Sequence, residues 1–142
     1  LNNNPLPIYG KGLNSREWIY VNDHCRGLFT IYKRGKSGES YNIGTGENID
    51  NLNLTKLLIK IIREKKITIG KKVKIKFVKD RPGHDLRYAL NTTKIYKSFK
   101  WVPYKKFKNG LAETFEWYSK NYEFFSYFSK KKFFKRLGLK IW

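Results

Sequence analysis

Two spacings of apolar residues alternate along the chain, and they predict two kinds of element. Between residues 54 and 62, apolar side chains recur every three or four positions, the pattern of a helix with one buried face. Between residues 72 and 77, Val, Ile and Phe alternate with Lys, the pattern of a half-exposed strand. The chain therefore combines helices with strands.

Turn residues and candidate caps divide the remainder into further elements. Asn22 and Asp23 are candidate caps for a helix that ends before a glycine-rich turn, and Asn91 and Thr92 cap a short helix that ends at residue 99. We predict strands at 7–9, 17–21, 41–44 and 73–77, and further helices at 24–32 and 108–125. This alternation predicts the α/β class. The last helix is expected to bury Leu111, Phe115, Tyr118 and Tyr122.

Composition limits the kind of protein. The 142 residues are 40% hydrophobic and 17% aromatic, enough apolar surface for a packed core in one domain or part of one. The single cysteine, Cys25, excludes an internal disulfide framework and indicates a reducing compartment. No apolar run approaches the roughly 20 residues that cross a bilayer. The chain contains no Met and begins at Leu1, so we expect a piece of a longer protein.

The charge balance is strongly basic. Lys and Arg number 31 against 11 Asp and Glu, which gives a net charge of +20. Such a balance is typical of proteins that bind polyphosphates through counterion release. Only seven basic residues are Arg, however, and the Lys residues are spread over the whole chain, whereas planar bidentate contacts usually come from Arg. We attribute the charge mainly to a compositional bias and keep nucleic-acid binding as an alternative.

Two arginines are candidate anion ligands. Arg16 precedes an extended apolar stretch, and Arg81 lies between Asp80 and a Pro-Gly turn at the end of a predicted strand. Loops at strand ends often carry function in α/β folds. Two guanidinium groups from separate loops can hold a pyrophosphate bidentately. A surface ion pair of Arg81 with Asp80 or Asp85 is the simpler alternative.

Three other patterns are assigned no catalytic role. His24 and His84 have no further ligand at metal-binding spacing, so no metal site is predicted, although His84 can donate to an anion. Residues 43–46 start like a dinucleotide fingerprint but lack its third glycine. Four Tyr-x-x-x-Lys pairs, the spacing of a short-chain dehydrogenase base, are close to what chance predicts in a chain so rich in both residues.

Several longer motifs share one order along the chain. The matching segments lie at 6–12, 16–24, 41–44, 80–88 and 116–118, and their most specific parts are Arg-Glu-Trp at 16–18 and Arg-Pro-Gly-His-Asp at 81–85. Together they resemble the C-terminal half of an extended short-chain dehydrogenase/reductase, most closely of the dTDP-glucose 4,6-dehydratase family. The resemblance implies a Rossmann-type fold whose N-terminal dinucleotide-binding part is missing here. It implies a nucleotide-sugar-binding part at 1–125. The basic aromatic tail at 126–142 has no clear match in the family.

The resemblance also implies a substrate site. Tyr9 and its two predecessors match a strand that contacts the nucleotide, and Arg16 and Arg81 match arginines that bind the diphosphate. Asn51 matches an amide near the nucleotide, and His84 a further contact to the diphosphate. The implied substrate-binding residues are Pro7, Ile8, Tyr9, Arg16, Asn51, Asp80, Arg81, Pro82, Gly83 and His84.

The implied activity is that of a hydro-lyase. The family converts dTDP-glucose to dTDP-4-keto-6-deoxyglucose and water with bound NAD, in deoxysugar-nucleotide synthesis. Its catalytic and NAD-binding residues belong to the half that would precede Leu1, so none is expected in this chain. We expect a cytoplasmic homodimer when complete, with dTDP-glucose or a similar nucleotide-sugar as ligand and neither membrane nor nucleic acid as partner. The alternatives are another NAD-dependent nucleotide-sugar epimerase or dehydratase, and a small basic nucleic-acid-binding protein.

Overall fold

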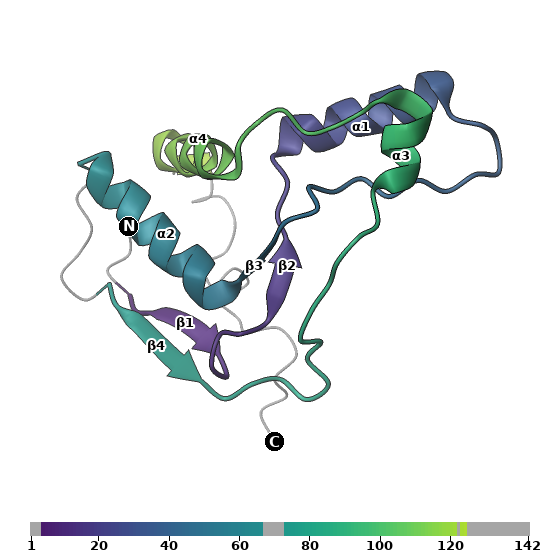
Figure 1. Cartoon of the computed structure of the whole chain (residues 1–142). Coiled ribbons are helices and arrows are strands. Elements are labelled where there is room, and N and C mark those ends of the chain that lie inside the picture. Colours follow the sequence, from purple (N-terminus) through teal and green to yellow (C-terminus); the bar gives the residue numbers. More distant parts are fainter. Residues whose placement is uncertain (1–3, 67–72, 122, 125–142) are drawn as a thin grey trace.

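A computed structural model of the protein describes residues 4–66, 73–121 and 123–124. The basic aromatic tail predicted at 126–142 and the predicted burial of Tyr122 lie outside these residues. Within them the chain forms four short strands and four helices (Figure 1), which confirms the α/β class. None of the helices in this part of the chain is long and apolar enough to cross a membrane.

The strands form two separate two-stranded sheets. β1 (Leu6–Tyr9) pairs in parallel with β4 (Ile75–Val78), and β2 (Ser15–Glu17) pairs antiparallel with β3 (Asn48–Asp50). Parallel neighbours need a long connection between them. Segments that are far apart in the sequence therefore lie side by side in the β1–β4 sheet (Figure 1).

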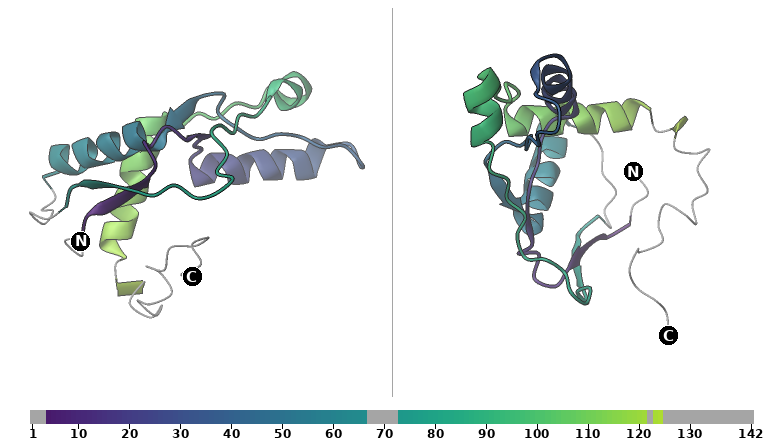
Figure 2. Two further views of the ribbon diagram at one scale, coloured as in Figure 1. Left: turned by 90° about the horizontal axis from the view of Figure 1, so that it is seen from below. Right: turned by 90° about the vertical axis from the view of Figure 1, so that its right-hand side faces the viewer.

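The four helices lie on one side of the β1–β4 pair (Figure 1 and Figure 2). Their bounds are α1 (Val21–Arg34), α2 (Asn51–Glu64), α3 (Thr93–Phe99) and α4 (Phe107–Lys120). α2 confirms the helix predicted at 54–62, and the Asp50 carboxylate caps it by accepting the Asn53 backbone N–H at 2.8 Å. α2 packs against α4, where Lys108 pairs with Glu64 at 3.0 Å.

The buried apolar core of the described residues is small. It consists of Ile8, Ile61, Ile62, Ile95 and Trp101. α1 contributes no large side chain to it and instead buries Gly27, where a Cβ atom would lie 2.9 Å from Ile43 and 3.2 Å from Trp101. The apolar α1 residues Leu28 and Tyr32 are 51% and 86% exposed. α1 therefore packs through its smallest residue because the segment beside it approaches closely.

The start of α1 corrects one sequence prediction. The helix begins at Val21 rather than 24, and neither Asn22 nor Asp23 caps it. Tyr20 occupies the N-cap position without a side-chain cap hydrogen bond. Asp23 lies in the first turn and is only 1% exposed. Its carboxylate is needed for a tertiary contact, which sequence spacing does not reveal.

That contact fastens α1 to the segment before α4. Asp23 accepts backbone N–H groups of Tyr104 at 3.3 Å and Lys105 at 3.0 Å, and it pairs with Arg26 at 3.1 Å. The Arg26 guanidinium carbon lies 4.7 Å from the centre of the Tyr104 ring and 5.4 Å from that of Trp101. We call these five residues the Asp23–Arg26 joint. It pairs an arginine stacked on rings with a buried carboxylate.

Two predicted strands differ from the structure. Residues 41–44 have no strand conformation, and the strand predicted at 17–21 ends at Glu17, as part of β2. A strand requires a neighbour to pair its backbone groups, and no described strand lies beside 41–44. β3 was not predicted, because its three residues lie in a stretch with the composition of a loop.

The last predicted helix is shorter than expected. α4 ends at Lys120 rather than 125, where the Asn121 side chain donates to the Trp117 carbonyl at 2.8 Å. Tyr118 is 49% exposed, so its predicted burial is wrong, whereas Leu111 and Phe115 are half-buried. The side chain of Asn121 competes with the next helical bonds, which is a common way for a helix to end.

Candidate functional site

The parallel β1–β4 pair brings two loops together. Tyr9 lies opposite Val78 at the end of the pair, and the Gly10 N–H donates to the Val78 carbonyl at 2.8 Å. Since both strands end at the same edge, the chain after Tyr9 meets the loop that begins at Asp80. The sequence predicted both segments as parts of the site, and the sheet explains why they are neighbours.

Asp80 organises the second loop. Its carboxylate accepts the Arg81 backbone N–H at 2.8 Å and lies 2.7 Å from Nδ1 of His84. The hydrogen bond with His84 lowers the pKa of Asp80, and the Arg81 N–H adds to this effect. At Gly10, with φ of +54°, a Cβ atom would lie 2.8 Å from the Asp80 carboxylate. Glycine is therefore required where the two loops touch.

Arg81 lies over an aromatic ring beside this turn. Its guanidinium carbon is 5.2 Å from the centre of the Tyr9 ring, and the His84 ring meets Tyr9 edge-on at a centroid distance of 6.0 Å. The Nε of Arg81 is buried and has no hydrogen-bond partner among the described residues. The alternative considered for Arg81, an ion pair with Asp80 or Asp85, is absent from the ion pairs of the described residues. An anion would supply hydrogen-bond acceptors for the Arg81 guanidinium.

Arg16 reaches the same loop from β2. Its two terminal nitrogens donate to the carbonyls of Ser15 at 2.6 Å and Asp85 at 2.9 Å, and its guanidinium carbon lies 4.2 Å from the centre of the Tyr88 ring. The charges of Arg16 and Arg81 both act to lower the pKa of Tyr88, although a hydrogen bond to Asp85 raises it overall. The two arginines thus act on one loop. We call Tyr9, Arg16, Arg81, His84 and Tyr88 the two-arginine site.

The other predicted residues have different positions. Ile8 is 4% exposed and belongs to the core, whereas Pro7 is exposed on β1, and Pro82 and Gly83 form an exposed turn. Asn51 is the first residue of α2, and its backbone N–H donates to the Asn14 carbonyl at 3.1 Å. Among the described residues, no hydrogen bond or ion pair joins the Asn51 side chain to the two-arginine site. Its assignment to the site stays a prediction.

Sequence reasoning missed two residues that hold the site together. Asn14 is 5% exposed, and its side chain donates to the Asp85 carbonyl at 3.2 Å. Glu17 accepts the Leu90 N–H at 2.9 Å and the Thr45 N–H at 3.1 Å. Glu17 stands within the Arg-Glu-Trp motif, so the motif offered a signal for it, whereas a lone Asn in a turn offered none.

The glycines at 44–46 do not form a phosphate cradle. The Thr45 N–H and, at 3.5 Å, the Gly46 N–H donate to the Glu17 carboxylate. Backbone N–H groups that hold a pyrophosphate point at it from the start of a helix, but here β3 follows. A carboxylate already occupies the position that an anion would need.

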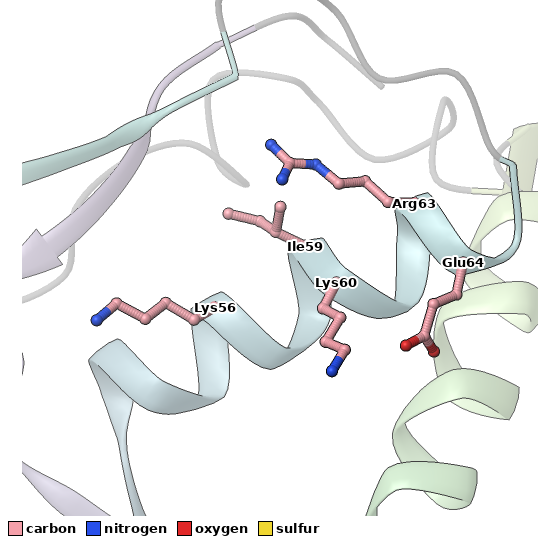
Figure 3. A pocket seen from close by; sticks show the side chains of 5 residues that line it. All are labelled: Lys56, Ile59, Lys60, Arg63 and Glu64. Carbon is pink, nitrogen blue, oxygen red and sulfur yellow. The ribbon is translucent and has the colours of Figure 1, made fainter.

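Two hollows of the described residues lie away from the site arginines. One of about 500 Å³ lies on the outer face of α2 and is lined by Lys56, Ile59, Lys60, Arg63 and Glu64 (Figure 3). Another of about 510 Å³ lies beside the Asp23–Arg26 joint and is lined by residues that include Trp18, Tyr20, Tyr104 and Phe107. The two-arginine site is formed by the end of β1, by β2 and by the loop that follows β4.

Known proteins resemble this chain over most of its length. It is 45% identical over 120 residues to dTDP-glucose 4,6-dehydratase 1 of Escherichia coli (strain K12). The match covers 82% of this chain and 32% of that protein. The solved structure of DesIV, a dTDP-glucose 4,6-dehydratase of Streptomyces venezuelae with NAD and TDP ligands, is 38% identical with a TM-score of 0.76. That match covers 87% of this chain and 36% of DesIV.

Related enzymes with another activity have the same fold. The UDP-glucose 4-epimerase of Thermotoga maritima, solved with UDP-glucose, is 27% identical with a TM-score of 0.72, over 84% of this chain and 36% of the epimerase. The chain spans about a third of the length of the curated relatives it matches. The family model described as GDP-mannose 4,6 dehydratase matches residues 1–114. The fold, the shared motifs and this match confirm the resemblance seen in the sequence, and the chain belongs to the GDP-mannose 4,6 dehydratase family.

Proposed function

We propose that this chain is the nucleotide-sugar-binding part of a dTDP-glucose 4,6-dehydratase. The observation that carries the proposal is the two-arginine site. Arg16 and Arg81 each stack on a ring, and neither forms an ion pair with a carboxylate of the described residues. A diphosphate carries the charge and the oxygen geometry that two guanidinium groups bind bidentately.

The proposed reaction is the conversion of dTDP-glucose to dTDP-4-keto-6-deoxyglucose and water. NAD would supply the hydride acceptor and donor when bound. The described residues offer no cradle for its pyrophosphate, because Glu17 occupies the glycine loop at 44–46. This chain would therefore contribute to substrate binding, with Tyr9, Arg16, Arg81 and His84 holding the nucleotide. We further propose a cytoplasmic homodimer as the working form.

Binding of dTDP by the 142-residue chain, measured by isothermal titration calorimetry, tests the proposal. We expect dTDP to bind and thymidine to bind at least about 100-fold more weakly, because the diphosphate supplies the charge-assisted hydrogen bonds. Arg81→Ala should abolish this preference. The matched control is Arg63→Ala, which removes an exposed arginine on α2 and should change nothing. Equal affinity for dTDP and thymidine would contradict the proposal.

Two alternatives make different predictions. A related nucleotide-sugar epimerase or dehydratase is favoured by the fold shared with the Thermotoga maritima enzyme, and it would bind UDP at least as tightly as dTDP. A basic nucleic-acid-binding protein would bind DNA with a steep salt dependence, and Arg81→Ala would weaken DNA and dTDP binding equally. Dehydratase activity itself is assayed on a longer polypeptide that contains this chain.

A further inference from the structure

We propose that Tyr88 is a positioning residue that holds the Arg16 guanidinium ready for a diphosphate. The inference rests on the proposed function and adds a residue that the motif resemblance did not include in the site. Tyr88 is 54% exposed, so it makes little contribution to the core. Its contacts are concentrated on one neighbouring arginine and on one carboxylate.

The backbone sets Tyr88 beside β2. The Ser15 N–H donates to the Leu86 carbonyl at 2.8 Å, and the Tyr88 N–H donates to the Ser15 carbonyl at 3.2 Å. This parallel bridge places the Tyr88 ring next to the residue that follows Ser15. The guanidinium carbon of Arg16 lies 4.2 Å from the ring centre, the distance of a cation–π contact.

Two carbonyls fix the guanidinium over the ring. The carbonyls of Ser15 and Asp85 each accept a hydrogen bond from one terminal nitrogen of Arg16. A guanidinium group has five N–H donors, so these two bonds leave donors for a ligand. A planar group held between a ring and two carbonyls loses little further freedom when it binds a diphosphate.

The Tyr88 hydroxyl has a second effect, on charge. It donates to the carboxylate of Asp85, the residue whose backbone carbonyl accepts from Arg16. The Asp85 backbone carbonyl accepts a hydrogen bond from Arg16, while the Asp85 carboxylate accepts one from Tyr88. The side chains of Asp85 and Arg16 form no ion pair in the described part of the chain. Tyr88 therefore keeps a competing anion away from the arginine. The positive charge of Arg16 stays available for the ligand.

A double-mutant cycle on the 142-residue chain tests this role through the dissociation constant for dTDP. We expect Arg16→Ala to weaken binding about 100-fold and Tyr88→Leu about 10-fold. Because Tyr88 acts through Arg16, the double variant should bind like Arg16→Ala alone. Tyr88→Phe keeps the ring and releases the Asp85 carboxylate, and we expect about a threefold loss. The control is Tyr96→Leu. Tyr96 is 49% exposed, and its ring centre lies 5.1 Å from the Nζ of Lys100, so it too is an exposed tyrosine beside a cation.

A spectroscopic measurement separates positioning from a general structural effect. The NMR signal of the Arg16 Nε–H carries a ring-current shift from Tyr88, which Tyr88→Leu should remove while Tyr88→Phe retains it. Additive losses in the cycle, or an unchanged Arg16 signal in Tyr88→Leu, would overturn the inference and leave the proposed function intact. Wild-type affinity in Arg16→Ala would instead overturn the diphosphate role of Arg16, and this inference with it.

Discussion

Among the residues that the structure describes, four arginines lie over aromatic rings, and Arg16, Arg26 and Arg81 do so in two different settings. In the Asp23–Arg26 joint, a carboxylate that is 1% exposed neutralises the guanidinium at 3.1 Å. In the two-arginine site, the carboxylates of Asp80 and Asp85 are bonded to His84, to a backbone N–H and to Tyr88 instead. Stacking on a ring is therefore common to both settings. What separates them is whether the arginine also forms an ion pair with a carboxylate.

The largest expected effect breaks the joint. Asp23→Ala removes the acceptor of two backbone N–H groups and of Arg26, and we expect a loss of about 3 kcal/mol in the free energy of unfolding. Urea unfolding measures this change. Asp50→Ala, which removes the α2 cap, is the comparison variant and should cost about 1 kcal/mol. A joint that contributes only to binding would show unchanged unfolding and weaker dTDP affinity.

Measuring both dTDP affinity and stability for variants of Arg81 and Arg26 sharpens the comparison between the two settings. Arg81→Ala should weaken dTDP binding by about 2.7 kcal/mol, or 100-fold, and change unfolding by no more than about 0.5 kcal/mol. Arg26→Ala should do the opposite, with about 2 kcal/mol lost from stability, because it leaves the buried Asp23 without its cation. Calorimetry and urea unfolding on both variants provide the four values. The comparison fails if both arginines change the same readout.

A smaller loss of stability is expected from a change at Glu17, the last residue of β2. Its carboxylate accepts N–H groups from the 45–46 loop and from Leu90. Glu17→Gln replaces one acceptor oxygen by an NH₂ group that faces backbone donors, and we expect about 1.5 kcal/mol less stability. Glu47→Gln is an exposed control on the same loop. Equal unfolding midpoints for the two variants would show that the carboxylate is dispensable.

The smallest effect is a dependence on pH. The pKa of Asp80 is lowered by its bonds to His84 and to the Arg81 N–H, so the folded state binds a proton there less readily than the unfolded state. This contribution to stability is present above the unfolded pKa of about 4 and is lost as pH falls through the lower folded value. Asp80→Asn should therefore show a shallower loss of stability below pH 4 than the wild type. Parallel curves would mean that the Asp80 bonds contribute nothing.

The sequence predicted the local elements better than the contacts between them. Periodicity located α2, and a motif located Arg81 and His84. Capping statistics assigned Asp23 to the helix start, however, because the backbone N–H groups that it accepts are about 80 residues further along the chain. The absence of a strand at 41–44 has a similar cause, since alternating residues form a strand only beside a partner. Asn14 gains its importance from Asp85, which lies 71 residues further along the chain and which no local pattern connects to it.

The parallel pairing of Leu6–Tyr9 with Ile75–Val78 also has a kinetic consequence. The chain between these two strands is long, and bringing its ends together costs chain entropy before any contact between the strands compensates for that cost. Such non-local pairing slows folding. The contact between Tyr9 and Arg81 depends on that pairing, so we expect it to form after the transition state, when α2 and α4 are already packed. A nucleotide that binds beside this contact would then slow unfolding and leave the refolding rate unchanged.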